Sequence, residues 1–105
     1  MADLDLRLIS KMPKDIDITG GYASDLLSDV MANAKDGYIW ITNQKHQNCI
    51  AVASLLNLSA IIIAGGVEPD AGTIVKAVDE HVPIFTTDAS VFNVTGELYR
   101  LGLRG

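Results

Sequence analysis

The stretch SAIIIAGGVEPD, residues 59–70, runs from a continuous apolar segment into two glycines and an acidic turn. A short, uninterrupted and β-branched run such as residues 60–64 is typical of a central strand that is buried on both faces of a parallel sheet. Gly65 and Gly66 end this strand without side chains. Either the backbone simply takes a positive φ there, or the bare amides at the start of the next helix approach an anion.

Strands and helices alternate on both sides of this central strand. Residues 38–42 and 83–87 have the pattern of short apolar strands, and residues 46–58, 70–81 and 90–102 have helical spacing. Toward the N-terminus, residues 4–9 and 16–22 alternate with the period of strands, a turn at Pro13 separates them, and a helix spans 24–37. This order predicts an α/β fold. We expect a three-layer α/β/α sandwich with a mainly parallel sheet of about five strands, in which the first strand or two run antiparallel at one edge.

Local signals predict the ends and the buried faces of these helices. Ser24 is expected to cap the first helix and Gly37 to end it, while residues 86–88 are expected to cap the last helix. Helix 46–58 is apolar nearly all round, so we expect it to be buried on more than one side. The core residues expected on the other helices are Leu26, Leu27, Val30, Met31, Ala34, Ile74, Val75, Val78, Val91, Phe92, Val94, Leu98, Tyr99 and Leu101.

Length and composition limit the class of protein. The chain has 105 residues, which suits a single domain spanning 1–105, and its formal net charge is −5. An acidic chain without a basic patch is poorly suited to nucleic acid or to an anionic membrane surface, so neither partner is expected. Cys49 is the single cysteine, which fits a reducing, cytoplasmic location. The N-terminus lacks the features of a signal peptide, and no segment reaches the ~20 apolar residues of a membrane span.

Polar or glycine-rich turns follow the predicted parallel strands. Because ligands of open parallel sheets bind beyond the carboxyl ends of the strands, we expect these turns to form one edge with a ligand site. The proposed ligand-binding residues are Gly20, Gly21, Ser24, Asp25, Thr42, Gln44, Lys45, His46, Asn48, Gly65, Gly66, Glu68, Thr86 and Thr87. Lys45 is the only lysine among them, so backbone amides are expected to make most contacts with an anion. Helix capping and tight turns alone also explain Ser24 and the glycines, and that interpretation stays open.

Catalytic and metal sites have little support in the sequence. No GxGxxG, GxxxxGK[ST] or Gly-x-Ser-x-Gly pattern occurs. His46 and Cys49 are three residues apart, which suits two metal ligands on one helix face, but the chain has no second such pair, so we expect no metal and no cofactor. General acid–base chemistry has one plausible set, His46 with Asp25 or Glu68. We therefore expect that the chain is not an enzyme.

Several blocks of the sequence together resemble the DRTGG domain family. These blocks are SDLLSDVMA, WITNQKHQN, IAVASLL, IIIAGGVEPD, VPIFTT and LYRLGL, and the resemblance covers roughly residues 16–103. The family occurs beside CBS domains in regulatory pyrophosphatases, inside phosphotransacetylases and as short stand-alone proteins, and its fold is similar to the N-terminal domain of HPr kinase/phosphorylase. Lys45 and His46 stand at the family's Asp-Arg position, and residues 64–66 stand at its Thr-Gly-Gly position. The arginine that would bind an anion is therefore absent.

The resemblance implies an α/β sandwich that commonly dimerises and serves as a regulatory or ligand-sensing module. The leading hypothesis is a homodimeric module that binds a small anionic metabolite or nucleotide at the carboxyl ends of the strands. The second is a protein–protein interaction or dimerisation domain without a ligand, in which the apolar helix 46–57 buries one face. The third is a small enzyme that uses His46, and no nucleophile motif accompanies that residue.

Overall fold

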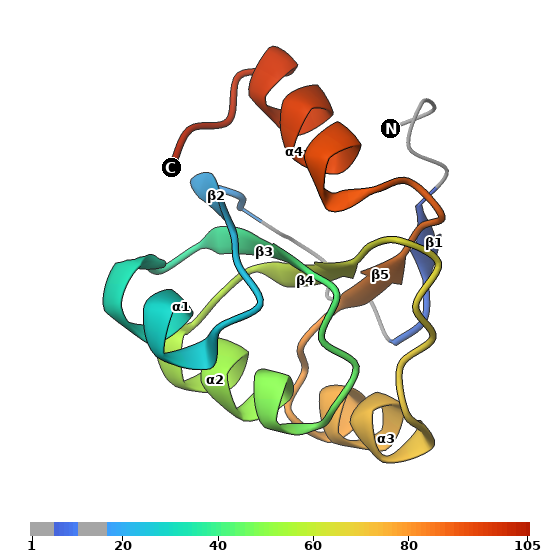
Figure 1. The fold of residues 1–105 in the computed structure, drawn as a ribbon. Coiled ribbons are helices and arrows are strands. Elements are labelled where there is room, and N and C mark those ends of the chain that lie inside the picture. Colours follow the sequence, from blue (N-terminus) through green and yellow to red (C-terminus); the bar gives the residue numbers. More distant parts are fainter. Residues whose placement is uncertain (1–5, 11–16) are drawn as a thin grey trace.

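One five-stranded sheet, with strands in the order β1-β5-β4-β3-β2, forms the centre of the computed structural model, which describes residues 6–10 and 17–105 (Figure 1). The elements are β1 (Arg7–Leu8), β2 (Gly20–Ala23), α1 (Leu27–Asn33), β3 (Tyr38–Thr42), α2 (Asn48–Leu56), β4 (Ala60–Ile63), α3 (Ala71–Asp79), β5 (Ile84–Thr86) and α4 (Val91–Arg100). Strands β2 to β5 run parallel, and β1 is antiparallel to β5. The predicted α/β class, mainly parallel sheet and antiparallel N-terminal edge are confirmed. The turn predicted at Pro13 lies outside the described residues.

Helices cover both faces of the sheet and make three layers (Figure 1). Successive residues of a strand point to opposite faces, so Trp40 and Ile61 belong to the core beneath α1, α2 and α3. Ile41 and Ile62 belong to a second core beneath α4. The chain changes face after β5, because α3, which links β4 to β5, lies on the same side of the sheet as α1 and α2, whereas α4, which follows β5, lies on the other.

The apolar helix α2 is the middle helix of its layer. It packs between α1 and α3 and buries Cys49, Ile50, Val52 and Ala53. Its predicted burial on more than one side is therefore confirmed, although Leu55 is exposed. Neither α2 nor any other helix in the described part of the chain is long and apolar enough to cross a bilayer.

Strand β2 begins later than the sequence predicts. The alternating pattern favours a strand over 16–22 that runs into Gly20 and Gly21 at its end, but β2 starts at Gly20 and continues to Ala23. A Cβ on Gly20 would lie 2.5 Å from the Arg104 carbonyl oxygen and 2.6 Å from the Tyr38 ring. Close packing inside the strand, rather than a turn after it, therefore requires this glycine.

The helix ends also differ from the expected ones. Ser24 does not cap α1, because its hydroxyl accepts the Leu26 amide at 3.2 Å in a turn before the helix. The helix stops at Asn33, and Gly37 takes its positive φ in the turn that leads to β3. Ser90, rather than residues 86–88, caps α4 by accepting the Asn93 amide at 3.1 Å.

The buried faces of α3 and α4 are narrower than their apolar patterns suggest. Helix α3 buries Thr73 and Ala77, and the Thr73 hydroxyl donates to the Lys45 carbonyl at 2.7 Å. Helix α4 buries Val94 and Leu98. The predicted core residues that are exposed instead are Leu26, Met31, Val75, Val78, Phe92, Tyr99 and Leu101. Several helices thus carry a second apolar face that the sheet does not reach.

Candidate functional site

The loops that follow the four parallel strands share one edge of the sheet, which we call the rim. The rim consists of residues 24–26, 42–48, 64–70 and 86–90. His46, Gly65 and Thr86 lie at this common edge, as the sequence predicts. Gly20 and Gly21 were expected there too, but they begin β2 and so lie at the amino end of that strand.

Asp25 joins the loop after β2 to the loop after β3. Its Oδ1 accepts the Thr42 hydroxyl at 2.7 Å and the Asn43 amide at 2.8 Å. Its carbonyl oxygen accepts the side-chain amide of Gln44 at 2.6 Å. Asp25, Thr42 and Gln44, which the sequence assigned to a ligand, therefore bind one another.

The glycine turn after β4 is joined to the loop after β5. The Gly65 amide donates to the Ala89 carbonyl at 2.7 Å, and the Gly66 amide donates to the Thr87 carbonyl at 3.0 Å. Both glycines have positive φ, +76° and +74°. Of the two alternatives for these glycines, the positive φ is the one observed. The amides of Gly65 and Gly66 bind the protein's own backbone, so these two groups are not available to an anion.

His46 pairs with Asp70, and neither Asp25 nor Glu68 is its partner. The distance between His46 Nδ1 and Asp70 Oδ2 is 2.7 Å, and both side chains are exposed. The expected pairing of His46 with Asp25 or Glu68 is wrong, because the loop after β4 brings the N-cap residue of α3 to the histidine. The Asp70 amide also donates to the Lys45 carbonyl at 3.1 Å, which closes the contact between these two loops.

Cys49 is not placed as a nucleophile or as a metal ligand beside His46. Its Sγ donates to the His46 carbonyl oxygen at 2.8 Å, and burial raises the pKa of the thiol to about 11. A thiol with such a pKa carries almost no thiolate at neutral pH. Among residues 6–10 and 17–105, no group of three histidine, cysteine or acidic side chains is arranged to hold a metal ion.

Acidic side chains outnumber basic ones at the rim. The carboxylates belong to Asp25, Glu68, Asp70 and Asp88, whereas the lysine is Lys45. Among the described residues, Arg7 of β1 is a second cation that reaches this edge. Its Nη2 lies 3.7 Å from Asp88 Oδ1, and its Nε lies 3.4 Å from Thr86 Oγ1. This balance of charge disfavours a polyanion at the rim.

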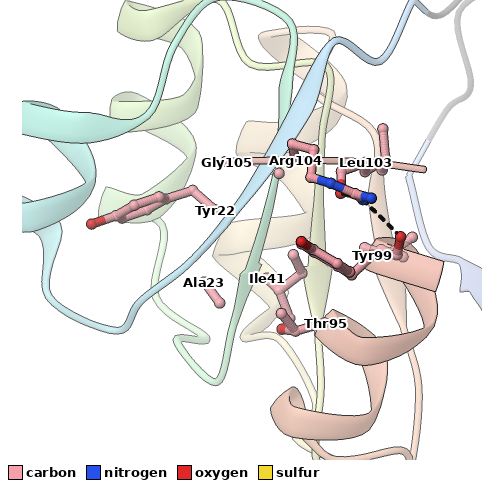
Figure 2. Close-up of a pocket in the computed structure, with 10 residues that line it drawn as sticks. Tyr22, Ala23, Ile41, Thr95, Tyr99, Leu103, Arg104 and Gly105 are labelled. Carbon is pink, nitrogen blue, oxygen red and sulfur yellow. Dashed lines mark hydrogen bonds between the residues drawn. The ribbon is translucent and has the colours of Figure 1, made fainter. Parts of the chain in front are cut away.

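A pocket lies away from the rim, between β2, α4 and the C-terminal segment (Figure 2). It encloses about 60 Å³, which is well below the range for small-molecule sites, ~300–1,000 Å³, so a ligand would enter it only in part. Its lining residues are Gly21, Tyr22, Ala23, Ile41, Thr95, Leu98, Tyr99, Leu103, Arg104 and Gly105.

The pocket exists because β2 carries little bulk on this face of the sheet. Gly21 and Ala23 pair with Ile39 and Ile41, which belong to the core beneath α4, so these two small residues lie on the same face of the sheet. The Tyr22 ring points away from the pocket (Figure 2). Five strands make a sheet about 19 Å wide at ~4.8 Å per strand spacing, whereas one helix is only about 10 Å wide. A single helix therefore leaves part of this face uncovered.

Arg104 and Tyr99 form the polar lip of the pocket. The guanidinium carbon lies 3.7 Å from the centroid of the Tyr99 ring, and Nη1 donates to the Tyr99 carbonyl at 2.9 Å. The Arg104 carbonyl accepts the Gly21 amide at 3.1 Å, which fixes this segment beside β2. Within the described part of the chain, no carboxylate lies at ion-pair distance from this arginine.

The sequence pattern did not indicate this pocket. Its parts come from the second strand, the last helix and the segment after it, and no motif joins them. The one available signal was the pair of glycines, Gly20 and Gly21. The alternation of apolar and polar residues predicted that this pair lies at the end of a strand. Glycine inside a strand often marks a close approach of another backbone, and Arg104 makes that approach.

Comparison with known proteins shows a likeness in fold. No family model matches the sequence, and no curated protein matches it. The fold is similar to a crystal structure of the CBS and DRTGG domains of the regulatory region of Clostridium perfringens pyrophosphatase, in complex with its activator diadenosine tetraphosphate. The TM-score is 0.66 at 16% identity over 90% of this chain, which spans 42% of that chain. The likeness shows a related fold for this chain and no more than that.

Proposed function

We propose that this chain is a regulatory module that senses a small anionic molecule, and that the molecule binds in the pocket between β2 and α4. The observation that carries the proposal is Arg104, a cation stacked on Tyr99 at the lip of an apolar pocket without a carboxylate partner among the described residues. Arginine presents a planar set of donors that suits carboxylate and phosphate groups.

A nucleotide has the chemistry that this pocket would recognise. The pocket is too small to enclose a base, so a nucleotide would place a phosphate group on the guanidinium of Arg104 and its base against the exposed Tyr99 ring at the mouth. The structurally similar regulatory region was crystallised with a nucleotide activator, which supports trying adenine nucleotides first. Binding is favoured over catalysis because Cys49 is buried as a neutral thiol and so supplies no nucleophile.

The rim is the alternative place for the ligand, and Lys45 is its exposed lysine. Its glycine amides are bound to the loop after β5, and carboxylates surround it. The pocket is therefore the better-supported site. Binding in the pocket requires Arg104, whereas binding at the rim requires Lys45, and both side chains are exposed. Substituting each residue in turn therefore distinguishes the two sites.

The test is a thermal-shift and calorimetric titration with inorganic phosphate, AMP, ADP and ATP. Ligand at a hundredfold excess over its dissociation constant stabilises a protein by about 2.7 kcal/mol, so the Tm of wild type should rise by roughly 10 °C or more. Lys45→Ala should keep this rise, whereas Arg104→Ala should lose about tenfold or more in affinity. Urea unfolding without ligand shows whether each variant is folded.

Two results would count against this assignment. Loss of the shift in Lys45→Ala but not in Arg104→Ala would move the ligand to the rim. Absence of a shift with every member of the panel in wild type would reject a phosphate or nucleotide ligand.

A further inference from the structure

The interior of the pocket between β2 and α4 is lined mainly by apolar groups. Ile41 of β3 and Leu98 of α4 are buried in the second core of the sheet, and Leu103 packs against the same core. Ala23 lines the pocket from β2, the edge strand (Figure 2). Such a lining favours an aliphatic group, because the group leaves water when it enters the pocket.

Gly21 keeps this interior open although the described residues do not require a glycine there. A Cβ at Gly21 would lie 3.5 Å from Cγ2 of Ile39 and 3.8 Å from Cδ1 of Ile41, which are ordinary contact distances. Its φ is not positive, and glycine inside a strand weakens the strand. In contrast to Gly20, which the Arg104 carbonyl approaches closely, the missing side chain of Gly21 mainly leaves space in the pocket.

Arg104 places a cation at the lip of this interior. Its Nη1 donates to the carbonyl oxygens of Tyr99 at 2.9 Å and Leu103 at 2.8 Å. These bonds and the stacking on the Tyr99 ring hold the guanidinium in place. Among the described residues, Nε and Nη2 have no hydrogen-bond partner. Two free donors of one guanidinium suit a phosphate group, so one ligand can place an anion at the lip and a chain in the interior.

The volume of the interior limits the length of that chain. The pocket holds about 60 Å³, and one water-sized group needs about 10–15 Å³ of such a volume. We propose that the pocket selects a phosphate ester with an unbranched aliphatic chain of about four or five carbons. The inference rests on the function proposed above, because the same Arg104 binds the phosphate. A nucleotide uses the lip alone, whereas this ester also fills the interior.

The experiment is a calorimetric titration of wild type with inorganic phosphate and with n-alkyl phosphates from methyl to octyl. Each methylene that enters the interior should lower the dissociation constant by up to about fourfold, equivalent to about 0.8 kcal/mol. The gain should end near butyl or pentyl phosphate, because the rest of a longer chain stays in water. Arg104→Ala should weaken every member of the series.

Two variants fill the interior and leave the cation in place. Ala23→Leu should weaken butyl phosphate by about tenfold or more and leave inorganic phosphate unchanged. Gly21→Ala should have a smaller effect in the same direction, and it should raise the Tm because the strand gains a side chain. Ala51→Leu makes the matched change at an exposed position of α2, on the other face of the sheet, and should leave every affinity unchanged.

The results separate this inference from the proposed function. Binding that needs Arg104 but is equally tight for inorganic, methyl and butyl phosphate would overturn the inference alone. A gain that continues to octyl phosphate, or that persists in Ala23→Leu, would also overturn it, because the chain would then lie outside the interior. If neither phosphate nor any ester binds, both the inference and the phosphate site are rejected. Urea unfolding checks that the variants fold, and the wild-type series decides the question without them.

Discussion

The two glycines after β4 hold two loops of the rim together, and this makes a side chain costly there. Gly65 has a φ of +76°, and a Cβ would stand 2.9 Å from Nδ2 of Asn43, whose amide donates to the Ala64 carbonyl at 2.8 Å. A left-handed φ costs roughly 1–2 kcal/mol for a residue with a Cβ. We therefore expect Gly65→Ala to lower the free energy of unfolding by about 2 kcal/mol in urea denaturation.

Gly72→Ala is the matched control for this substitution. Gly72 lies in α3, and a Cβ there would meet nothing within 4 Å. Alanine should therefore stabilise the helix by about 0.5–1 kcal/mol. Equal effects of the two substitutions would show that the backbone contacts of Gly65 do not constrain it.

Cys49 provides a prediction about pH. Burial raises the pKa of its thiol to about 11, whereas an exposed thiol ionises near pH 9. The unfolded chain therefore loses this proton first as the pH rises. The raised pKa favours the folded state fully below pH 9, and this contribution is lost between about pH 9 and pH 11. From this group the free energy of unfolding should fall by up to ~1.4 kcal/mol per pH unit.

Urea unfolding of wild type and Cys49→Ala at a series of pH values measures this contribution. The difference in stability between the two proteins should be constant below pH 9 and should shrink above it. A constant difference across the whole range would mean that the thiol ionises equally in the folded and unfolded states.

At the scale of elements, α4 depends on the cap at its first turn. Ser90 accepts the Asn93 amide at 3.1 Å, and loss of an N-cap costs about 1 kcal/mol. We expect Ser90→Ala to lower the free energy of unfolding by about this amount. Ser28→Ala, on the exposed surface of α1, should stay within about 0.5 kcal/mol of wild type. An unchanged Ser90→Ala would mean that solvent replaces the cap without loss.

The order of the elements could be predicted from the sequence, but the faces of the helices could not. The run YIWIT gave β3 its observed bounds, Tyr38–Thr42, because a short apolar segment between polar turns has one plausible conformation in an α/β chain. In α4, by contrast, Val94 and Leu98 fit the helical period, and so do Phe92 and Tyr99. Periodicity cannot decide which apolar stripe meets the sheet. The position of the rim could also be predicted, because the carboxyl ends of parallel strands lie at the same edge of a sheet.

At the scale of the whole molecule, the polar groups of the rim stabilise the fold, and the pocket lies away from them. Asp25 and the amides of Gly65 and Gly66 join neighbouring loops, which ties together the carboxyl ends of four strands. The other face of the sheet has one helix, α4 (Figure 1), and there the pocket lies between α4, β2 and the C-terminal segment. The pocket could not be predicted, because its wall needs Arg104 beside Gly21, a contact between distant parts of the chain.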